Sequence, residues 1–243
     1  MTGKIALVTG GAKRIGRAIS LALANEGVNV IVHYNSSADE ANDLASEIRK
    51  LGRNAWSLKA DFGKVEDYES LIERALAEAG SVDILVNSAS MFPSDRIENV
   101  TFEGMESSMR VNAWVPFVLC REFKRLVEKG TIINILDSRI TGYDWAHVGY
   151  IWSKHVLAVM TRMLALDYAP DITVNAVAPG LILPPPGQDE SYLERLSSTV
   201  PLKRHGESND VAEAVLFLVK SSFVTGQVIY VDGGRHVRES GEW

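Results

Sequence analysis

The stretch Thr9-Gly10-Gly11-Ala12-Lys13-Arg14-Ile15-Gly16 decides the fold of this chain. It follows the apolar run Ile5-Ala6-Leu7-Val8, which is typical of a buried strand, and it opens a segment with helical spacing. A strand, a glycine-rich turn and a helix N-terminus together form a site for a dinucleotide pyrophosphate. Gly10 allows the tight turn and Gly16 allows close helix–strand packing, whereas Arg14 stands where such loops usually carry a third glycine. An arginine there can pair with phosphate or with a polar substrate.

The composition excludes several classes of partner. The chain has 243 residues, 46% of them hydrophobic, so it can bury one large core as a single α/β domain. A net charge of −6 argues against nucleic acid or an anionic membrane as the main partner. Cys120 is the one cysteine, so an internal disulfide is impossible and a cytoplasmic location is expected. We expect no targeting segment, and no apolar run approaches the roughly 20 residues of a membrane helix.

Short apolar runs alternate with helical spacing along the whole chain. The expected strands are Ile5–Thr9, Val28–His33, Ala55–Leu58, Ile84–Asn87, Thr131–Leu136, Thr173–Val177 and Val228–Val231. Continuous apolar strands with intervening helices indicate a parallel sheet covered on both faces. We therefore predict one domain over residues 1–243, a doubly wound, seven-stranded parallel sheet of the Rossmann type.

The stretch from Pro179 to Gln188 is the one irregular segment, and it includes Pro184-Pro185-Pro186. A short helical pattern follows from Tyr192 to Leu196. A loop and a short helix over a site are typical of a lid, so residues 180–205 are expected to cover the substrate. A plain surface excursion is the alternative.

A second motif, Tyr150-Ile151-Trp152-Ser153-Lys154, places a tyrosine and a lysine one helical turn apart on the same face. The unperturbed pKa of tyrosine is about 10, so the residue is a poor acid or base at neutral pH. A nearby lysine ammonium favours the tyrosinate and is expected to lower that pKa. An exposed helix pair would be the alternative if the glycine loop were absent.

With both motifs in place, nearly the whole chain resembles the short-chain dehydrogenase/reductase family. The matching positions are Gly10, Gly11 and Gly16, Asn87-Ser88-Ala89-Ser90, Val111-Asn112-Ala113, Tyr150 with Lys154, Pro179-Gly180 and Val231-Asp232-Gly233-Gly234. The resemblance implies that Lys154 binds the nicotinamide ribose, that Tyr150 donates a proton, and that Asn112 holds a proton-relay water.

Two departures from the family pattern narrow the substrate. The family's catalytic serine usually lies thirteen residues before the tyrosine, and this position is Asp137. Ser138 follows directly, so a one-residue difference in loop length would restore a serine. We favour Asp137 because Arg14 departs in the same direction. Arg14 with an Asp-Tyr-Lys set resembles the pteridine reductase branch, including the bacterial dihydromonapterin reductases.

Phe92 supports this interpretation. Ala89-Ser90-Met91-Phe92 matches the place where those enzymes stack a pterin between an aromatic ring and the nicotinamide; ordinary packing is the alternative. Reduction of a dihydropterin adds hydride to a ring carbon and a proton to the adjacent nitrogen, and Asp137 would help Tyr150 deliver that proton. The expected substrate-binding residues are Arg14, Ser90, Phe92, Asp137 and Tyr150, and the expected catalytic residues are Tyr150, Lys154, Asp137 and Asn112.

The end of the second strand predicts the cofactor. An acidic residue there would bind a ribose diol and repel a 2′-phosphate, but Val32-His33-Tyr34-Asn35-Ser36-Ser37 carries no carboxylate. We predict NADPH, with donors to the phosphate from this segment and positive charge from Lys13 and Arg14. Asp61-Phe62 resembles the family's adenine-binding pair. The expected cofactor-binding residues are Gly10, Lys13, Arg14, Ile15, His33, Tyr34, Asn35, Ser36, Ser37, Asp61, Phe62, Asn87, Ser88, Ala89, Tyr150, Lys154, Pro179, Gly180 and Leu181.

Three functions follow from these patterns. The leading hypothesis is an NADPH-dependent pteridine reductase that acts on dihydropterins, with dihydrofolate as a second candidate substrate. A carbonyl reductase of the same family, of the 3-oxoacyl, sugar or steroid type, is the enzymic alternative. A non-catalytic NADP(H)-sensing regulator is the alternative from another class, although Tyr150, Lys154 and Asn112 argue against it because a sensor needs no proton relay.

Other expectations concern surroundings and assembly. His147 and Trp145 are expected to line the substrate cleft, and no cluster with metal-ligand spacing is present in the sequence. The resemblance implies a homotetramer, with the helices around Trp114–Val127 and Ile151–Met163 packing between subunits. Arg238 in the basic tail is a candidate to reach a neighbouring subunit's substrate site, and a solvated tail is the alternative.

Overall fold

Seven strands lie side by side in one parallel sheet, in the order β3-β2-β1-β4-β5-β6-β7. The computed structural model describes residues 1–185 and 187–238, so Pro186 of the triple proline and the tail beyond Arg238 lie outside the described residues. The strands are β1 (Ile5–Val8), β2 (Asn29–Tyr34), β3 (Ala55–Lys59), β4 (Ile84–Asn87), β5 (Gly130–Ile135), β6 (Ile172–Pro179) and β7 (Val228–Val231). The predicted doubly wound fold is confirmed.

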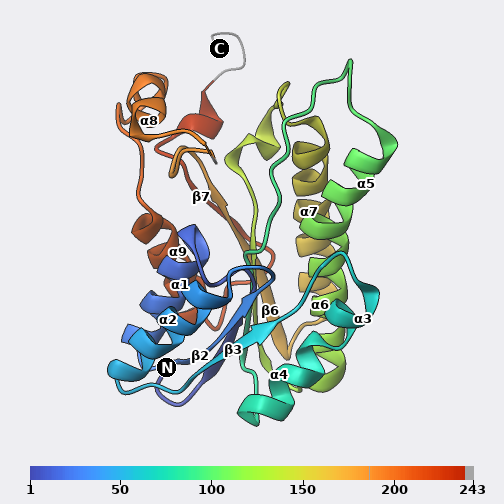
Figure 1. Cartoon of the computed structure of the whole chain (residues 1–243), viewed down its shortest axis with the longest axis vertical. Helices are drawn as coiled ribbons and strands as arrows, with labels where there is room; N and C mark the ends of the chain where they lie inside the picture. The colour runs from blue at the N-terminus through green and yellow to red at the C-terminus, as the bar shows by residue number, and fades with distance from the viewer. Residues whose placement is uncertain (186, 239–243) are drawn as a thin grey trace.

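Helices cover both faces of the sheet, as Figure 1 shows. One face packs against α1 (Arg14–Asn25), α2 (Ala38–Lys50) and α9 (Ser208–Lys220). The other face packs against α3 (Val65–Glu69), α4 (Leu71–Ala79), α6 (Val115–Leu126) and α7 (Val148–Asp167). Helix α5 (Phe102–Met109) packs against α7, while α8 (Glu190–Ser197) stands apart from both layers at the top of the view in Figure 1.

Strand β1 shows why a strand at the centre of the sheet is apolar at every position. Ile5 and Leu7 pack into one helical layer, and Ala6 and Val8 pack into the other. Successive side chains of a strand point to opposite faces, and here both faces are covered. The uninterrupted apolar runs in the sequence therefore follow directly from the two-layer architecture.

The observed ends of the elements differ from the expected ones by one or two residues at several places. Strand β6 continues two residues beyond Val177 because Ala178 and Pro179 still pair with β7. The helix expected over Trp114–Val127 is α6, and a five-residue π-helix, Arg110–Trp114, joins it to α5. The sequence patterns did not predict this π-helix.

The glycine loop and the segment after β4 are held together where the order of strands reverses. The Oγ1 of Thr9, which follows β1, accepts hydrogen bonds from the backbone N–H groups of Ser88 and Ala89 at 2.9 and 3.0 Å. In open α/β sheets, ligands bind in the crevice at this reversal, beyond the carboxyl ends of the strands. Within the described ranges, no helix combines the length and the apolar character needed to cross a membrane.

Candidate functional site

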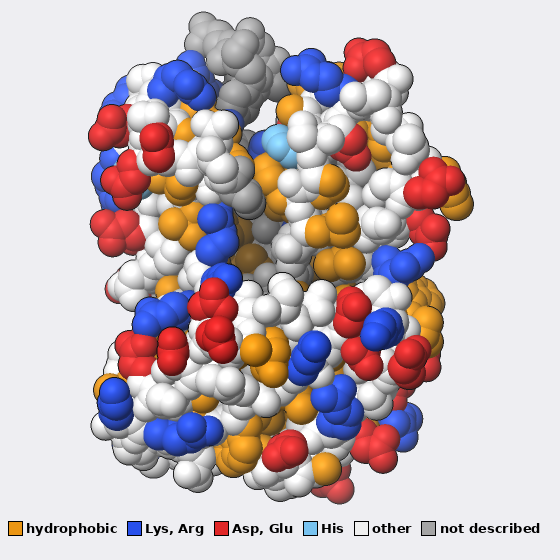
Figure 2. Space-filling view, viewed as in Figure 1, with side chains coloured by type: hydrophobic (Ala, Val, Ile, Leu, Met, Phe, Trp, Pro, Cys, Tyr) orange, Lys and Arg blue, Asp and Glu red, His pale blue; other side chains and the backbone are white. Residues whose placement is uncertain are grey.

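A cavity of about 430 Å³ lies at this crevice. The space-filling view shows the molecule hollowed near its centre, with Lys and Arg side chains beside the hollow (Figure 2). The predicted residues in the cavity wall are Gly10, Lys13, Arg14, Ile15, Ser88, Ala89, Ser90, Phe92, Asp137, Tyr150, Lys154, Pro179, Gly180 and Leu181. The segment after β6 and helix α8 also contribute to the wall, as expected for residues 180–205; whether they move as a lid stays a prediction.

The glycine loop is tightly packed, and Arg14 adopts a glycine-like conformation within it. A Cβ atom on Gly16 would lie 2.2 Å from the carbonyl oxygen of Gly10, and Gly10 itself has a φ of 61°. Arg14 has a φ of 54°, in the left-handed region where glycine is favoured. Its Nη2 donates to the carbonyl oxygen of Pro184 at 2.7 Å, so its guanidinium links the loop to the segment after β6.

Asp137, and not Ser138, faces the candidate catalytic tyrosine. The hydroxyl of Tyr150 donates to Oδ2 of Asp137 at 3.0 Å. Asp137 caps the short 3₁₀ helix Ser138–Thr141, whereas Ser138 is buried and does not line the cavity. The alternative that sequence reasoning left open is therefore decided by geometry: the carboxyl group occupies the place opposite Tyr150.

Charge and burial set the protonation of Tyr150 and Lys154. Burial and then the negative charge of Asp137 raise the pKa of Tyr150 well above its usual value. The expected lowering of this pKa is not found, because burial and then the charge of Asp137 act in the opposite direction. Burial lowers the pKa of Lys154 to about 8, and its Nζ donates to the carbonyl oxygen of Ile135 at 2.8 Å.

The side chain of Asn112 has no capacity left to hold a relay water. Its Oδ1 accepts from Ser90 Oγ at 3.0 Å and from the Met91 N–H at 2.9 Å. Its Nδ2 donates to the Met91 carbonyl and to Ser153 Oγ, both at 3.1 Å. The residue four positions later is Pro116, which has no N–H for an α-helical bond to the Asn112 carbonyl. That Asn112 holds a relay water stays a prediction.

A second cavity of about 300 Å³ lies beside the first and shares Gly10, Ala89 and Ser90 with it. Its wall contains the residues expected around the adenosine part of the cofactor. These residues are His33, Tyr34, Asn35, Ser36, Ser37, Asp61 and Phe62. Ser37 stands at the N-cap of α2 without a side-chain capping bond.

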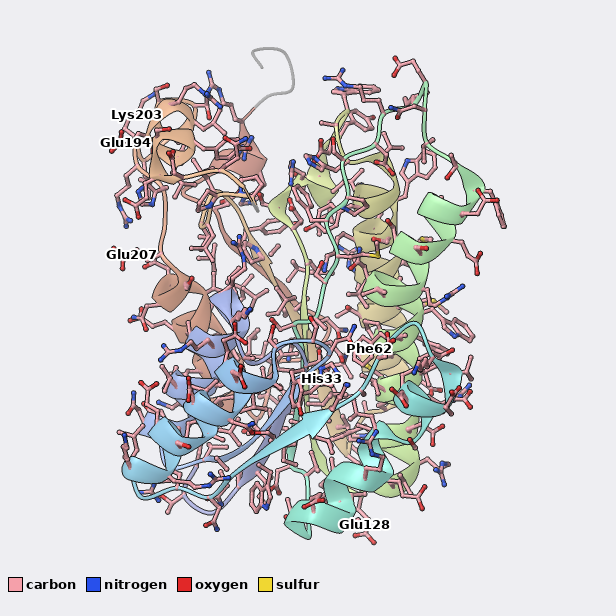
Figure 3. All side chains as sticks on the ribbon, viewed as in Figure 1. His33, Phe62, Glu128, Glu194, Lys203 and Glu207 are labelled. Carbon is pink, nitrogen blue, oxygen red and sulfur yellow. The ribbon has the colours of Figure 1, made fainter. Side chains whose placement is uncertain are left out.

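His33 corrects one cofactor-binding expectation. Its Nδ1 accepts from the N–H of Gly10 at 3.0 Å, its Nε2 lies 3.1 Å from the carbonyl oxygen of Ala60, and its ring stacks on Phe62 at 4.5 Å (Figure 3). Burial lowers the pKa of His33 to about 4, so the imidazole is neutral at pH 7. Both nitrogens are occupied, and His33 therefore positions the glycine loop and does not donate to a phosphate.

Asn87 also differs from the expectation that its side chain contacts the cofactor. Its side chain is buried beneath the crevice, where Nδ2 donates to Asn134 Oδ1 at 2.8 Å, and it does not line either cavity. It also contacts Sγ of Cys120 at 3.4 Å, and burial raises the pKa of this thiol to about 12. Asn87 ties β4 to β5, and Cys120 is an unreactive part of the core.

Phe92 lies between two rings. His147 stacks on it with centroids 3.8 Å apart, and Phe92 meets Tyr150 edge-on at 4.6 Å. His147 and Trp145 were expected to line the cleft, but neither is in the cavity wall. His147 instead stacks on Phe92 without lining the cavity, and Trp145 is largely exposed.

Sequence reasoning missed Arg139 and Arg235, which also line the main cavity, and it placed Tyr192 there only as part of the expected lid. Arg139 pairs with Asp137, Nη2 to Oδ2 at 3.0 Å, and the only sequence signal for it was that a buried carboxylate needs a counter-charge. Tyr192 and Arg235 reach the cavity from segments far away in the chain. Arg238, the candidate for a neighbouring site, donates to the carbonyl oxygen of Thr199 at 2.7 Å within its own chain.

The comparisons identify the family. Residues 10–236 match the family model described as enoyl-(acyl carrier protein) reductase. The chain belongs to the short-chain dehydrogenase/reductase family, and it is an oxidoreductase.

The similar proteins include enzymes named for two kinds of substrate. The 3-oxoacyl-(acyl-carrier-protein) reductase FabG of Staphylococcus epidermidis is 31% identical, over 96% of this chain and 99% of its own. FolM alternative dihydrofolate reductase 1 of Brucella suis, solved in complex with NADP, is 34% identical, with a TM-score of 0.93, over 98% of this chain and 97% of that one. The Brucella canis protein of the same name, also solved with NADP, has a TM-score of 0.94 at 34% identity, over 99% and 96% of the two chains.

The buried, neutral His33 predicts a specific dependence of stability on pH. Its folded pKa of about 4 lies below the unfolded value of about 6.5, so its contribution is fully present above pH 6.5 and is lost as pH falls toward 4. The loss amounts to about 3 kcal/mol. In His33→Asn, the free energy of unfolding should vary less over this range, as measured by urea unfolding at several pH values. The control His205→Asn should keep the wild-type slope; an unchanged slope in His33→Asn would contradict the assignment.

Proposed function

We propose that this protein is an NADPH-dependent pteridine reductase that reduces dihydropterins, with dihydrofolate as a further candidate. The single observation that carries the proposal is the contact between Asp137 and the hydroxyl of Tyr150, at the place where the family usually has a serine. A serine hydroxyl suits a carbonyl oxygen that becomes an alcohol. A carboxylate beside the tyrosine suits proton delivery to a ring nitrogen.

The residues present fit a dinucleotide. The N-terminus of α1 lies at the cavity wall, which Arg14, Ile15 and Gly16 line, and Gly10 has no room for a side chain because a Cβ would lie 2.9 Å from Ala89. Asn35, Ser36 and Ser37 line the second cavity, where a 2′-phosphate would meet donors and no carboxylate from the end of β2. The bound nicotinamide supplies the hydride.

The chain's own residues account for the proton. Tyr150 keeps its hydroxyl proton at neutral pH, as a proton donor must, although its raised pKa makes it a weaker acid than free tyrosine. Lys154 uses one ammonium N–H on the Ile135 carbonyl, so two remain for the ribose hydroxyls. Phe92 is covered on one face by His147, so a flat heterocycle can stack only on its other face.

The comparisons support the proposal from the structural side. The two Brucella proteins named as alternative dihydrofolate reductases were solved with NADP and superimpose over nearly the whole chain. The 31% identity to a 3-oxoacyl reductase favours carbonyl reduction as the second candidate. That candidate would need a hydroxyl opposite Tyr150, and Ser138 does not line the cavity. An NADP(H)-sensing regulator is the third candidate function, and for it we would expect cofactor binding without turnover.

We also propose a homotetramer in the cytoplasm. Large apolar side chains are exposed along α7 and at the end of the π-helix before α6, among them Trp114, Trp152, Val159, Met163 and Leu166. Exposed apolar patches on rigid helices are typical of contacts between subunits. Light scattering would show a mass four times that of one chain, and a monomer at micromolar concentration would contradict the proposal.

The main test compares two substrates and two variants. NADPH oxidation should be fast with dihydrobiopterin and slow with an acetoacetyl thioester. Asp137→Ser should lower kcat for the pterin at least tenfold, because Tyr150 loses its carboxylate partner, while the Kd for NADPH stays within twofold. Ser138→Ala is the matched control and should leave pterin turnover unchanged. If Ser138→Ala removes thioester reduction and Asp137→Ser does not affect the pterin, the carbonyl reductase is right.

The cofactor preference is tested at the end of β2. Ser36→Asp places a negative charge where the 2′-phosphate is expected, and two like charges about 4 Å apart cost roughly 4 kcal/mol at the effective dielectric of a protein surface. The kcat/KM for NADPH should fall at least tenfold and that for NADH should not. The control Ser46→Asp, on the exposed side of α2, should change neither. A wild-type preference for NADH would refute the prediction.

A further inference from the structure

The carboxylate of Asp137 has all of its hydrogen-bonding positions filled by two residues. Its Oδ1 accepts from the backbone N–H of Arg139 at 2.8 Å and from Nε of the same residue at 3.1 Å. Its Oδ2 accepts from Arg139 Nη2 at 3.0 Å and from the hydroxyl of Tyr150 at 3.0 Å. A carboxylate offers about four lone-pair positions, so Asp137 has none left for a substrate N–H.

Arg139 is itself held in place by a second carboxylate. Its Nη1 donates to Oδ2 of Asp144, and the same oxygen lies 2.9 Å from Nδ1 of His147. The guanidinium also lies over the ring of Phe92, 5.6 Å from its centroid. His147 stacks on the same ring, so Arg139, Asp144, His147 and Phe92 form one closed set of contacts.

We propose that Arg139 is a positioning residue for the reaction: its bidentate pair with Asp137 turns one carboxylate oxygen to the Tyr150 hydroxyl, so Asp137 orients Tyr150 and passes no proton itself. This inference rests on the proposed function, and it revises the role given to Asp137 there. The proton that reaches the substrate is then the hydroxyl proton of Tyr150, which is left as a tyrosinate and regains a proton from water, with Asp137 remaining a carboxylate throughout.

The electrostatics of the pair agree with the geometry. Burial alone would raise the pKa of Asp137, but the charge and hydrogen bonds of Arg139 and the bond from Tyr150 bring it below its usual value. The other ionisable groups that interact with Asp137 or Arg139 are Lys154 from α7, Arg235 from the C-terminal segment, and Asp144 beyond the guanidinium. Arg139 is the cation in direct contact with Asp137, so its removal leaves burial as the dominant influence and the carboxyl takes up a proton more readily.

A lysine cannot replace the arginine fully. The guanidinium presents two parallel N–H groups to the two oxygens of Asp137 and still has Nη1 for Asp144, whereas an ammonium is a single point of charge. Arg139→Lys should therefore restore charge without restoring the orientation of the carboxylate.

The first experiment measures kcat for dihydropterin reduction against pH in wild type, Arg139→Met and Arg139→Lys. In Arg139→Met the acidic limb should move up by at least one pH unit, because Asp137 becomes protonated and no longer accepts from Tyr150. Arg139→Lys should move it less while kcat stays below that of wild type. The Kd for NADPH should stay within twofold in both. Arg125→Met is the matched control: Arg125 pairs with Glu122 on the outer side of α6, and its loss should leave the profile unchanged.

The second experiment separates positioning from simple structural support. In an Asp137→Asn background the pair no longer exists, so adding Arg139→Met should change kcat less than threefold beyond Asp137→Asn alone. Equal losses in the two backgrounds, or a wild-type acidic limb in Arg139→Met, would overturn the proposal.

The third experiment needs no substrate, so it distinguishes failure of this inference from failure of the proposed function. The stability difference between wild type and Arg139→Met, from urea unfolding, should be larger at pH 7 than at pH 4, because only an ionised Asp137 suffers from the missing partner. The difference should shrink in the Asp137→Asn background. If Arg139→Met does not fold, folding of the double variant supports the pair. A stability difference that is independent of pH and of Asp137 overturns it, whether or not a pterin is reduced.

Discussion

The parallel pairing of β1 with β4, of β4 with β5, and of β5 with β6 is the constraint on which the site depends. Parallel strands end at the same edge of the sheet, so the segments that leave them converge there. The glycine loop follows β1, Phe92 follows β4, Asp137 follows β5 and Leu181 follows β6. None of these residues is near another in sequence, and the sheet alone brings them into one cavity wall.

Within that wall, the balance between burial and charge pairing decides what each group can do. Burial disfavours the charged form of Asp137, Tyr150 and Lys154 alike. Neighbouring charges then change the pKa of each group in a different way. Arg139 keeps Asp137 ionised, and the ionised Asp137 in turn keeps Tyr150 protonated. In this way the acid–base roles follow from which partner each residue contacts, more than from its own chemical type. Five cationic side chains and one carboxylate line the described part of this wall, which suits an anionic dinucleotide.

The fold was largely predictable, because each of its signals is local. The central strands β1 and β4 are largely apolar runs buried on both faces, and the turn after β1 needs glycine where a Cβ would meet backbone. The candidate site was predictable where it uses recurring motifs, as for Tyr150, Lys154 and Gly10. It was less predictable where a side chain can turn either way: His33 and Asn87 stand at expected positions, but their side chains bond inward to Gly10 and to Asn134.

The sequence by itself determined the doubly wound sheet, the nucleotide loop and the Tyr150–Lys154 pair, since these depend on residue type and short spacing. It also determined that Arg14 and Asp137 depart together from the family pattern. Only the tertiary structure decided that Asp137, and not Ser138, meets the Tyr150 hydroxyl, that Arg139 occupies the rest of that carboxylate, and that His147 backs Phe92. Those contacts depend on distances of a few ångströms between β5, α7 and the loop after β4, and no spacing along the chain encodes them.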